Sequence, residues 1–297
     1  FRTVIAQFDK NLDPEIANQI CYILEKVGIH NPYASKFYLA EDLPERLIKH
    51  KGCPSALNLM GIILSGQDQS FRYVFGVDPS EILTPLLVVI TPLTQNAIYC
   101  LDCMARVRMD TKYIESVADY VIAIMETAND QQLFQQILVF LSVFLPQSYP
   151  VATKLFCESD LIGSFSNFVS NDETIHSLFL NLFAQTLNSR YLHNEPIEGS
   201  DATESEFMSA AILKRITNEQ FAGLLEIAKQ NLDNERLYCD IYAAEILQGI
   251  CTKEGIPHEI LGEDFLTEMI NRLSQSANIH KKNIFAKVVL TLFSDFG

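Results

Sequence analysis

Apolar residues recur at helical spacing along most of the chain, and the stretch 82–144 shows this pattern most clearly. Two pairs of helices are predicted there, 82–93 with 97–107 and 117–125 with 133–145. In each pair, a helix of mixed polarity precedes a more apolar one. Pro146 is expected to end the second pair, because proline cannot continue a helix.

The same spacing is found on both sides of this stretch. Asp13-Pro14 is a typical helix start and Gly28 a typical helix end, so a helix is predicted between them. Its buried face is predicted to contain Ile16, Ile20, Ile23, Leu24 and Val27. Further helices are predicted over 34–39, 42–50 (with Asp42 as its cap), 55–64, 71–75, 151–157 and 204–216, and further apolar stripes begin at Leu161, Ile175, Phe221, Leu237, Phe265 and Ile284.

Residues 189–203 interrupt the pattern, because they combine two breakers and an acidic bias with no apolar period. We predict a long exposed loop there. Two interpretations are open, an acidic docking segment and a passive, tolerated insertion. Strand signals are nearly absent from the whole chain.

The helix pairs form a repeat. Intervals between successive first helices are 39, 35, 44, 60 and 44 residues, and the longest contains the 15-residue loop. Periods near 40 with two or three helices per unit are those of armadillo and HEAT arrays. The intervals are counted from the opening apolar residue of each pair, namely Leu43, Ile82, Val117, Leu161, Phe221 and Phe265.

Two segments carry a resemblance to the armadillo family. FCESDLI (156–162) resembles the junction between the first helix of a repeat and the next, and NAIYCLDCM (96–104) resembles the Ala-x-x-Ala-Leu-x-Asn-Leu core of the third helix. The resemblance implies an all-α fold, a right-handed α-α superhelix of about six repeats that forms a single domain over 1–297. It also implies a concave face, lined by the last helix of each repeat, as the binding surface.

The chain departs from the peptide-binding members of that family in one respect. Those proteins carry a ladder of asparagines on the concave helices, whereas here only Asn181 aligns with the ladder, and there is no Trp. Cys103, Val143, Gly249 and Leu292 occupy the equivalent positions. The groove is therefore expected to bind a folded surface or a helix.

Polar and amphipathic residues on the expected concave helices are the candidate protein-binding site. Tyr and Arg are favoured at the energetic centres of interfaces, although each such position can equally be an ordinary solvated helix surface. The candidates are Tyr99, Arg106, Gln136, Asn181, Gln185, Tyr238, Tyr242, Glu245 and Lys287.

Composition restricts the expected type of binding partner and the expected location of the protein in the cell. A net charge of −15 opposes nucleic-acid binding and favours a protein partner with a basic surface. No apolar run reaches the length of a membrane span, no signal segment opens the sequence, and no membrane insertion is expected. The seven cysteines are odd in number and lie in apolar helical patterns, and no glycosylation sequon occurs. A cytoplasmic location is predicted, with the nucleus as an alternative.

Motifs for catalysis or cofactors are weak. Cys100-x-x-Cys103 is consistent with zinc or redox chemistry, but it lies within a helix and has no second ligand pair, so two core thiols are the favoured interpretation. His50 and Cys53 lie at a helix end, where a basic residue interacts favourably with the helix dipole. No phosphate-binding loop and no paired carboxylates are found, so we predict no enzyme, no metal and no cofactor.

The leading hypothesis is a scaffold or adaptor that binds a partner protein through the concave face. By analogy of fold alone, the partners would be cytoskeletal regulators, kinases or chaperones. The alternative is an exchange factor or co-chaperone acting on a nucleotide-binding partner, such as a heat-shock chaperone, a small GTPase or an actin-related protein. A third hypothesis, an enzyme with a cryptic site, requires a deep polar pocket with strongly perturbed titrating groups.

Overall fold

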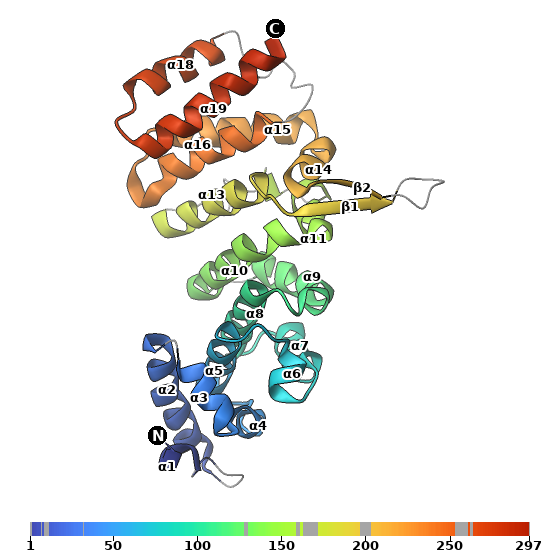
Figure 1. The fold of residues 1–297 in the computed structure, drawn as a ribbon, viewed down its shortest axis with the longest axis vertical. Coiled ribbons are helices and arrows are strands. Elements are labelled where there is room, and N and C mark those ends of the chain that lie inside the picture. Colours follow the sequence, from blue (N-terminus) through green and yellow to red (C-terminus); the bar gives the residue numbers. More distant parts are fainter. Residues whose placement is uncertain are drawn as a thin grey trace. The chain divides into compact units, whose positions relative to one another are not determined.

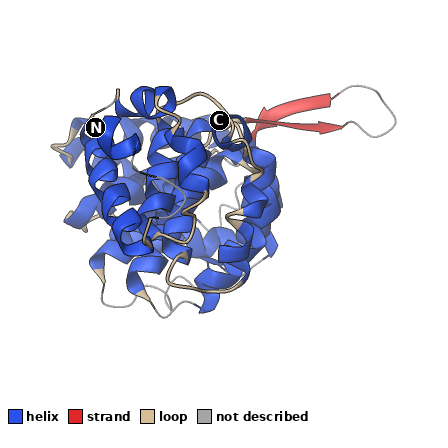
Figure 2. Cartoon of the chain, turned by 90° about the horizontal axis from the view of Figure 1, so that it is seen from below, coloured by secondary structure: helices blue, strands red, loops and turns tan. Residues whose placement is uncertain are grey.

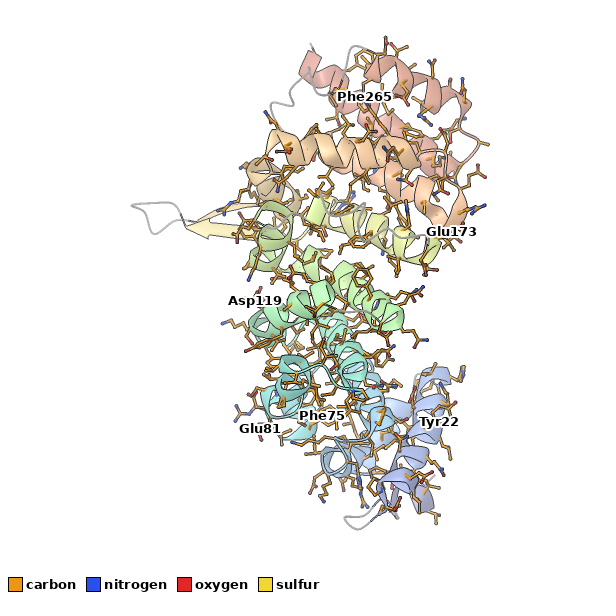
Figure 3. All side chains as sticks on the ribbon, turned by 180° about the vertical axis from the view of Figure 1, so that it is seen from behind. Tyr22, Phe75, Glu81, Asp119, Glu173 and Phe265 are labelled. Carbon is orange, nitrogen blue, oxygen red and sulfur yellow. The ribbon has the colours of Figure 1, made fainter. Side chains whose placement is uncertain are left out.

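A computed structural model describes residues 2–6, 8, 12–31, 33–127, 130–158, 161–162, 172–196, 203–252, 261 and 264–296. The chain forms two compact units, Phe1–Phe144 and Leu145–Gly297 (Figure 1). Within each unit, side chains fill the space between neighbouring helices (Figure 3). The single domain over 1–297 stays a prediction.

The N-terminal unit, Phe1–Phe144, is entirely helical in its described part. Helices α2, α5, α8 and α10 pack against one another in that order, while α3 packs against α5, and α7 and α9 pack against α8. The elements are α1 (Arg2–Ala6), α2 (Pro14–His30), α3 (Ala34–Ala40), α4 (Leu43–Ile48), α5 (Pro54–Ser65), α6 (Phe71–Phe75), the 3-10 turn η1 (Pro79–Glu81), α7 (Thr84–Val88), α8 (Thr94–Val107), α9 (Thr111–Thr127) and α10 (Gln131–Phe144).

The C-terminal unit, Leu145–Gly297, repeats this arrangement. Helices α13, α16 and α19 pack in succession, while α14, α15 and α18 pack against α13, α16 and α19 respectively. The elements are the 3-10 turn η2 (Leu145–Gln147), α11 (Tyr149–Thr153), the π-helical turn η3 (Lys154–Glu158), α13 (Glu173–Leu187), β1 (Leu192–Pro196), β2 (Thr203–Phe207), α14 (Met208–Arg215), α15 (Asn218–Asn231), the 3-10 turn η4 (Arg236–Tyr238), α16 (Cys239–Ile250), α18 (Phe265–Gln275) and α19 (Ile279–Phe296).

Polar side chains cap several helix starts, including the start predicted at Asp13. The Asp13 carboxylate accepts a hydrogen bond from the Glu15 backbone N–H, and Pro14 is the first residue of α2. Asp172 caps α13 in the same way. The prediction for Asp42 is wrong: it adopts a left-handed conformation (φ 54°) and makes no capping hydrogen bond with its side chain.

The predicted core face of α2 is only partly right. Leu24 is buried as predicted, whereas Ile16 and Ile23 are 51% and 54% exposed, and Ala17 and Cys21, each 0% exposed, lie in the interior instead. Gly28 does not end α2, which continues to His30. A Cβ atom at Gly28 would lie 2.8 Å from Ile62 Cγ2, so the glycine permits close packing of α2 on α5. The small residues face the neighbouring helix, and the large isoleucines remain outside.

The helix predicted over 82–93 is also too long. Only Thr84–Val88 is helical, and Val89 and Ile90 are exposed. Pro92 explains the early end, because a proline disfavours helical geometry in the residue before it and has no N–H to donate.

The segment predicted to be an exposed loop contains part of a hairpin. Strands β1 and β2 pair antiparallel, with Leu192 opposite Phe207 (Figure 2). Helix α14 therefore begins at Met208 and not at 204, and Met208 N donates to Tyr191 O (2.8 Å). Leu192 and Phe207 are both more than half exposed, so this end of the hairpin buries no apolar face that an alternating pattern could reveal.

Part of the predicted pattern lies outside the described residues. Phe165, Phe168 and Val169, which continue the stripe predicted from Leu161, are among these residues, as are Pro257 and Gly262, where the sequence predicts breaks between helices. Within the described part, no single helix is long and apolar enough to cross a membrane; one consecutive pair, Gln131–Gln147 with Tyr149–Glu158, would meet the criteria of length and composition only if taken together.

Candidate functional site

A groove crosses three successive helices of the C-terminal unit. Its cavity measures about 500 Å³ and opens to solvent along α13, α16 and α19. Three of the predicted binding residues, Gln185, Glu245 and Lys287, line it, one from each helix. The full set of lining residues, called the amide groove below, is Ala184, Gln185, Asn188, Glu245, Gln248, His280, Asn283, Ile284 and Lys287.

Asn188 sets the floor of the amide groove. Its Nδ2 donates to Ala184 O (2.9 Å) in its own helix and to Glu245 O (2.8 Å) in α16. Its Oδ1 accepts a hydrogen bond from Gln248 Nε2 (2.9 Å). The side chain thus joins two repeats through their polar groups and holds Gln248 in place. A partner would meet a rigid floor, which lowers the entropic cost of binding.

The third helix joins the groove through an acid–base pair. His280 Nε2 lies 3.2 Å from Glu245 Oε1, and the His280 side chain is 57% exposed. The Glu245 side chain is 24% exposed, so its carboxylate lies within reach of a basic partner on the α16–α19 side of the groove.

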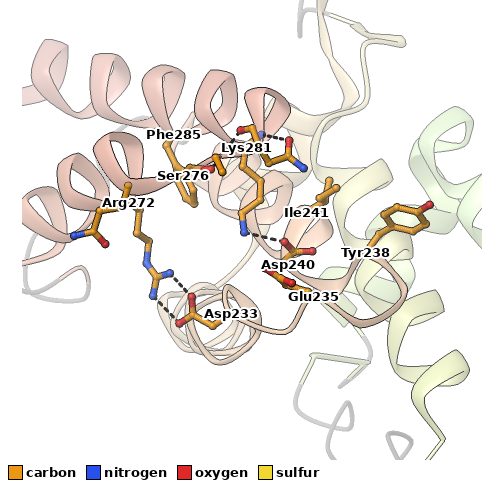
Figure 4. A pocket seen from close by; sticks show the side chains of 12 residues that line it. Asp233, Glu235, Tyr238, Asp240, Ile241, Arg272, Ser276, Lys281 and Phe285 are labelled. Atoms are coloured by element: carbon orange, nitrogen blue, oxygen red, sulfur yellow. Dashed lines mark hydrogen bonds and ion pairs between the residues drawn. The ribbon is translucent and has the colours of Figure 1, made fainter.

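A second cavity, of about 580 Å³, lies at the start of α16 and the α18–α19 turn (Figure 4). Two ion pairs cross it: Asp233 binds Arg272 with both carboxylate oxygens (2.8 and 3.2 Å), and Asp240 binds Lys281 (2.8 Å). The hydrogen bonds from Arg272 lower the pKa of Asp233. The charged groups of this cavity are mostly paired with each other.

Tyr238 stands at the rim of this second cavity and is 66% exposed. Leu237 and Tyr238 both adopt left-handed backbone conformations, with φ of 47° and 64°. Such conformations cost a residue other than glycine about 1–2 kcal/mol each. Ser177 Oγ donates to Leu237 O (2.7 Å) and helps to hold the turn.

The N-terminal unit contains the remaining predicted residues, Tyr99 and Arg106 on α8 and Gln136 on α10. Tyr99 is half-buried above Gly61, and burial raises the pKa of its hydroxyl. Arg106 binds Asp102, one turn earlier, through two hydrogen bonds of 3.1 Å. Asp102 is 5% exposed, and burial raises its pKa while the guanidinium of Arg106 counteracts that shift.

We expect Arg106→Met to lower the free energy of unfolding at pH 7 by about 1 kcal/mol, a modest figure because the Arg106 side chain is 51% exposed. The effect should vanish in acid. The pKa of Asp102 in the folded state lies above its ordinary value of 3.8, so the cost of ionising it is absent below that pH and grows as the pH rises through the folded pKa. Urea unfolding at pH 3.5 and pH 7 measures this difference, and the same loss at both values would contradict it.

The structure thus brings some of the predicted binding residues together in one cavity and leaves others outside it. Gln185, Glu245 and Lys287 share the amide groove and Tyr238 lines the second cavity, whereas Asn181 and Tyr242 line neither. Sequence reasoning missed four polar groove residues, each three, four or seven positions from a predicted one on the same helix face, where helical periodicity could have found them. They are Asn188, Gln248, His280 and Asn283.

The alignment used for the asparagine ladder was out of register. Cys103 and Leu292 are 4% and 1% exposed, so these positions face neighbouring helices and not a groove. Other asparagines link successive helices instead. Asn96 Nδ2 donates to Asn58 Oδ1 (2.9 Å) between α8 and α5, and Asn188 bridges α13 and α16.

The cysteine and histidine motifs fit structural roles. Cys100 and Cys103 are buried in α8, and burial raises the pKa of both thiols, that of Cys103 to about 12. The His50 ring packs edge-on against Phe8, and Cys53 is buried, with its thiol donating to Pro14 O (3.6 Å). In the ranges that the structure describes, no three His, Cys, Asp or Glu side chains gather as metal ligands.

Comparisons with known proteins identify the fold. No family model matches the sequence, and no curated protein does. Among solved structures, an engineered protein from a structural genomics consortium has a TM-score of 0.69 over 98% of this chain and 68% of its own, at 14% identity. A designed armadillo repeat protein in complex with the peptide (KR)4 has a TM-score of 0.60 over 84% of this chain and 98% of its own, at 10% identity. This chain has an armadillo-like helical repeat fold. It is an all-α solenoid, as the repeat length predicted.

Proposed function

We propose that this chain is a non-enzymatic scaffold that binds an extended, basic segment of a partner protein in the amide groove. The observation that carries the proposal is the convergence of Gln185, Glu245 and Lys287, from three successive helices, on one open cavity of about 500 Å³. Repeat proteins bind their partners along surfaces of this kind, which extend across successive units.

The groups in the groove favour an extended chain over the folded surface or helix that the missing asparagine ladder led us to expect. Gln185 and Asn283 are exposed amides, and each offers a donor and an acceptor that fit the N–H and C=O groups of a peptide backbone. They lie on α13 and α19, on opposite sides of α16, so a segment that crosses the helices can engage both. The carboxylate of Glu245 lies between them, within reach of a cationic side chain.

Charge supports a basic partner. Residues 145–297 contain 21 Asp and Glu against 11 Lys and Arg, a net charge of −10, so most of the excess negative charge of the chain belongs to this unit. A long-range field of this sign raises the rate at which a cationic segment arrives and makes binding dependent on salt. The designed armadillo repeat protein with (KR)4 is a precedent for a basic peptide on this fold.

A labelled (KR)4 peptide tests the proposal by fluorescence anisotropy. We expect saturable binding that weakens with salt, and a loss of about tenfold, equivalent to about 1.4 kcal/mol, for Glu245→Lys. Glu226→Lys on α15 is the matched control, because it makes the same change of charge at an exposed position outside both cavities. It should cost less than about threefold.

Equal losses for Glu245→Lys and Glu226→Lys would show that only the net charge attracts the peptide, and would overturn the assignment of the groove. A second variant, Gln185→Ala with Asn283→Ala, leaves the charge unchanged and should weaken binding by removing contacts to the peptide backbone. Its failure to do so would also count against an extended peptide in this groove.

A further inference from the structure

The first long helix carries an apolar stripe that the described part of the chain leaves partly exposed. Ile16, Ile20, Ile23 and Val27 follow the i, i+4, i+7, i+11 spacing of a single helix face. Ile16 and Ile23 are 51% and 54% exposed, and the other two are half-buried. This face of α2 is turned away from α5, on which the small residues of α2 pack. We call it the N-face.

The last helix carries a similar stripe. Ile279, Ala286, Leu290 and Phe293 share one face of α19, and the three large residues are 71%, 68% and 53% exposed. The Leu292 side, which packs inward, is 1% exposed. We call the outer stripe the C-face. It shares none of its residues with the amide groove, to which α19 contributes His280, Asn283, Ile284 and Lys287, but Asn283 lies on the same side of the helix.

Both stripes occupy positions where a further repeat would pack. Helix α5 lies between α2 and α8, and α16 lies between α13 and α19, so the interior helices are covered on two sides. By contrast, α2 and α19 each pack on a single member of their stack in the described part of the chain. An exposed apolar face on a repeat favours association with another repeat.

We propose that the C-face of one molecule docks on the N-face of a second copy of this chain, with α19 and α2 side by side and parallel. The contact continues the packing seen within each unit, where successive helices lie start to start. Asn18 at the start of α2 accepts from Ser55 N at the start of α5, and Lys281 at the start of α19 binds Asp240 at the start of α16.

Charge complementarity favours the second copy as the occupant. In the parallel arrangement, Asp13 and Glu15 at the exposed start of α2 come opposite the start of α19, where Lys282 follows Lys281. Helix α19 contains three Lys and one Asp in a chain whose net charge is −15. The acidic start of α2 and the basic start of α19 therefore attract each other, although the molecules as a whole repel.

Two variants of the whole chain test this heterologous contact. Ile16→Glu with Ile23→Glu removes the N-face, and Leu290→Glu with Phe293→Glu removes the C-face. All four residues are exposed, so the fold should be unaffected, and far-UV circular dichroism checks this. In sedimentation velocity up to about 200 µM, we expect the wild type to associate with increasing concentration and each variant alone to remain a monomer.

The mixture of the two variants gives the decisive result. Each retains the face that the other has lost, so an equimolar mixture should form a dimer and nothing larger. A wild type that remains a monomer over the whole range overturns the proposal, as does a mixture without heterodimer. Dimers of the C-face variant alone would indicate contact between two N-faces and overturn it as well. Glu15→Lys should weaken association, and Lys282→Glu should restore it in the partner molecule.

Discussion

Phe183→Ala is expected to lower the free energy of unfolding by about 3–5 kcal/mol, because it opens a cavity in the centre of the C-terminal unit. Phe183 on α13 is 0% exposed. Its ring meets Phe156 edge-on at 5.6 Å between centroids and lies 6.2 Å from Phe179. Truncation removes both aromatic contacts, each worth about 0.5–1.5 kcal/mol beyond the buried area. Urea unfolding followed by far-UV circular dichroism measures the loss.

Phe207→Ala is the control for this prediction. Phe207 belongs to the same unit and is 51% exposed on β2, so its truncation should change the free energy of unfolding by less than about 0.5 kcal/mol. Similar losses for the two variants would mean that Phe183 does not lie in a packed interior. The packing of α13 described here, on which the amide groove depends, would then be wrong.

Three long helices could be predicted well from the sequence. In α8, α9 and α10, the stripes that begin at Ala97, Val117 and Leu133 are buried as predicted, and each helix begins a few residues before its predicted start. Periodicity succeeds in these helices because the stripe with the clearest apolar spacing is buried in each, although α8 and α10 bury residues outside it as well. The repeat length follows from the same signal, since it counts the intervals between such helices.

Helix α2 shows where periodicity is insufficient. It offers two faces for burial, one with Ile16, Ile20 and Ile23 and one with Ala17 and Cys21. Hydrophobicity alone predicts that the face with the isoleucines is the buried one. The fold buries the smaller residues, because they let α2 approach α5 closely enough for Gly28 to meet Ile62. Which face is covered depends on the neighbour, and a pattern within one helix does not contain that information.

The candidate site, too, could be predicted only as far as it depends on the pattern within single helices. Local pattern is enough to place Gln185, Glu245 and Lys287 on solvent-facing sides of their helices. Their convergence on one groove depends on the stagger between α13, α16 and α19, which Asn188 and the packing of Gly249 help to set. The asparagine ladder was sought at Asn181, but the bridging residue is Asn188, two helical turns later. An error of two helical turns can be corrected only when the positions of the neighbouring helices are known.

Gly249→Ala is expected to cost about 2 kcal/mol of stability and to weaken (KR)4 binding together with it. A Cβ atom at this position in α16 would lie 2.7 Å from Leu187 Cβ and 2.8 Å from Leu187 O, so α13 and α16 must separate. Overpacking of this kind costs up to about 3 kcal/mol, and the higher helix propensity of alanine returns about 1 kcal/mol. Separation also stretches the Asn188–Glu245 bond next to Leu187, and the groove loses its floor.

Alanine substitutions at two other glycines, with more space around them, should lower the stability less. At Gly61 the nearest atom to an added Cβ is Cys103 Sγ at 3.0 Å, a side chain that can shift, so Gly61→Ala should cost less than Gly249→Ala. At Gly52 no atom lies within 4 Å, and Gly52→Ala should be neutral within about 0.5 kcal/mol. Chemical unfolding of the three variants should therefore rank their losses as Gly249, Gly61, Gly52. If Gly249→Ala were as stable as Gly52→Ala, α13 and α16 could not be in the close contact that forms the groove, and the binding site proposed here would lose its structural basis.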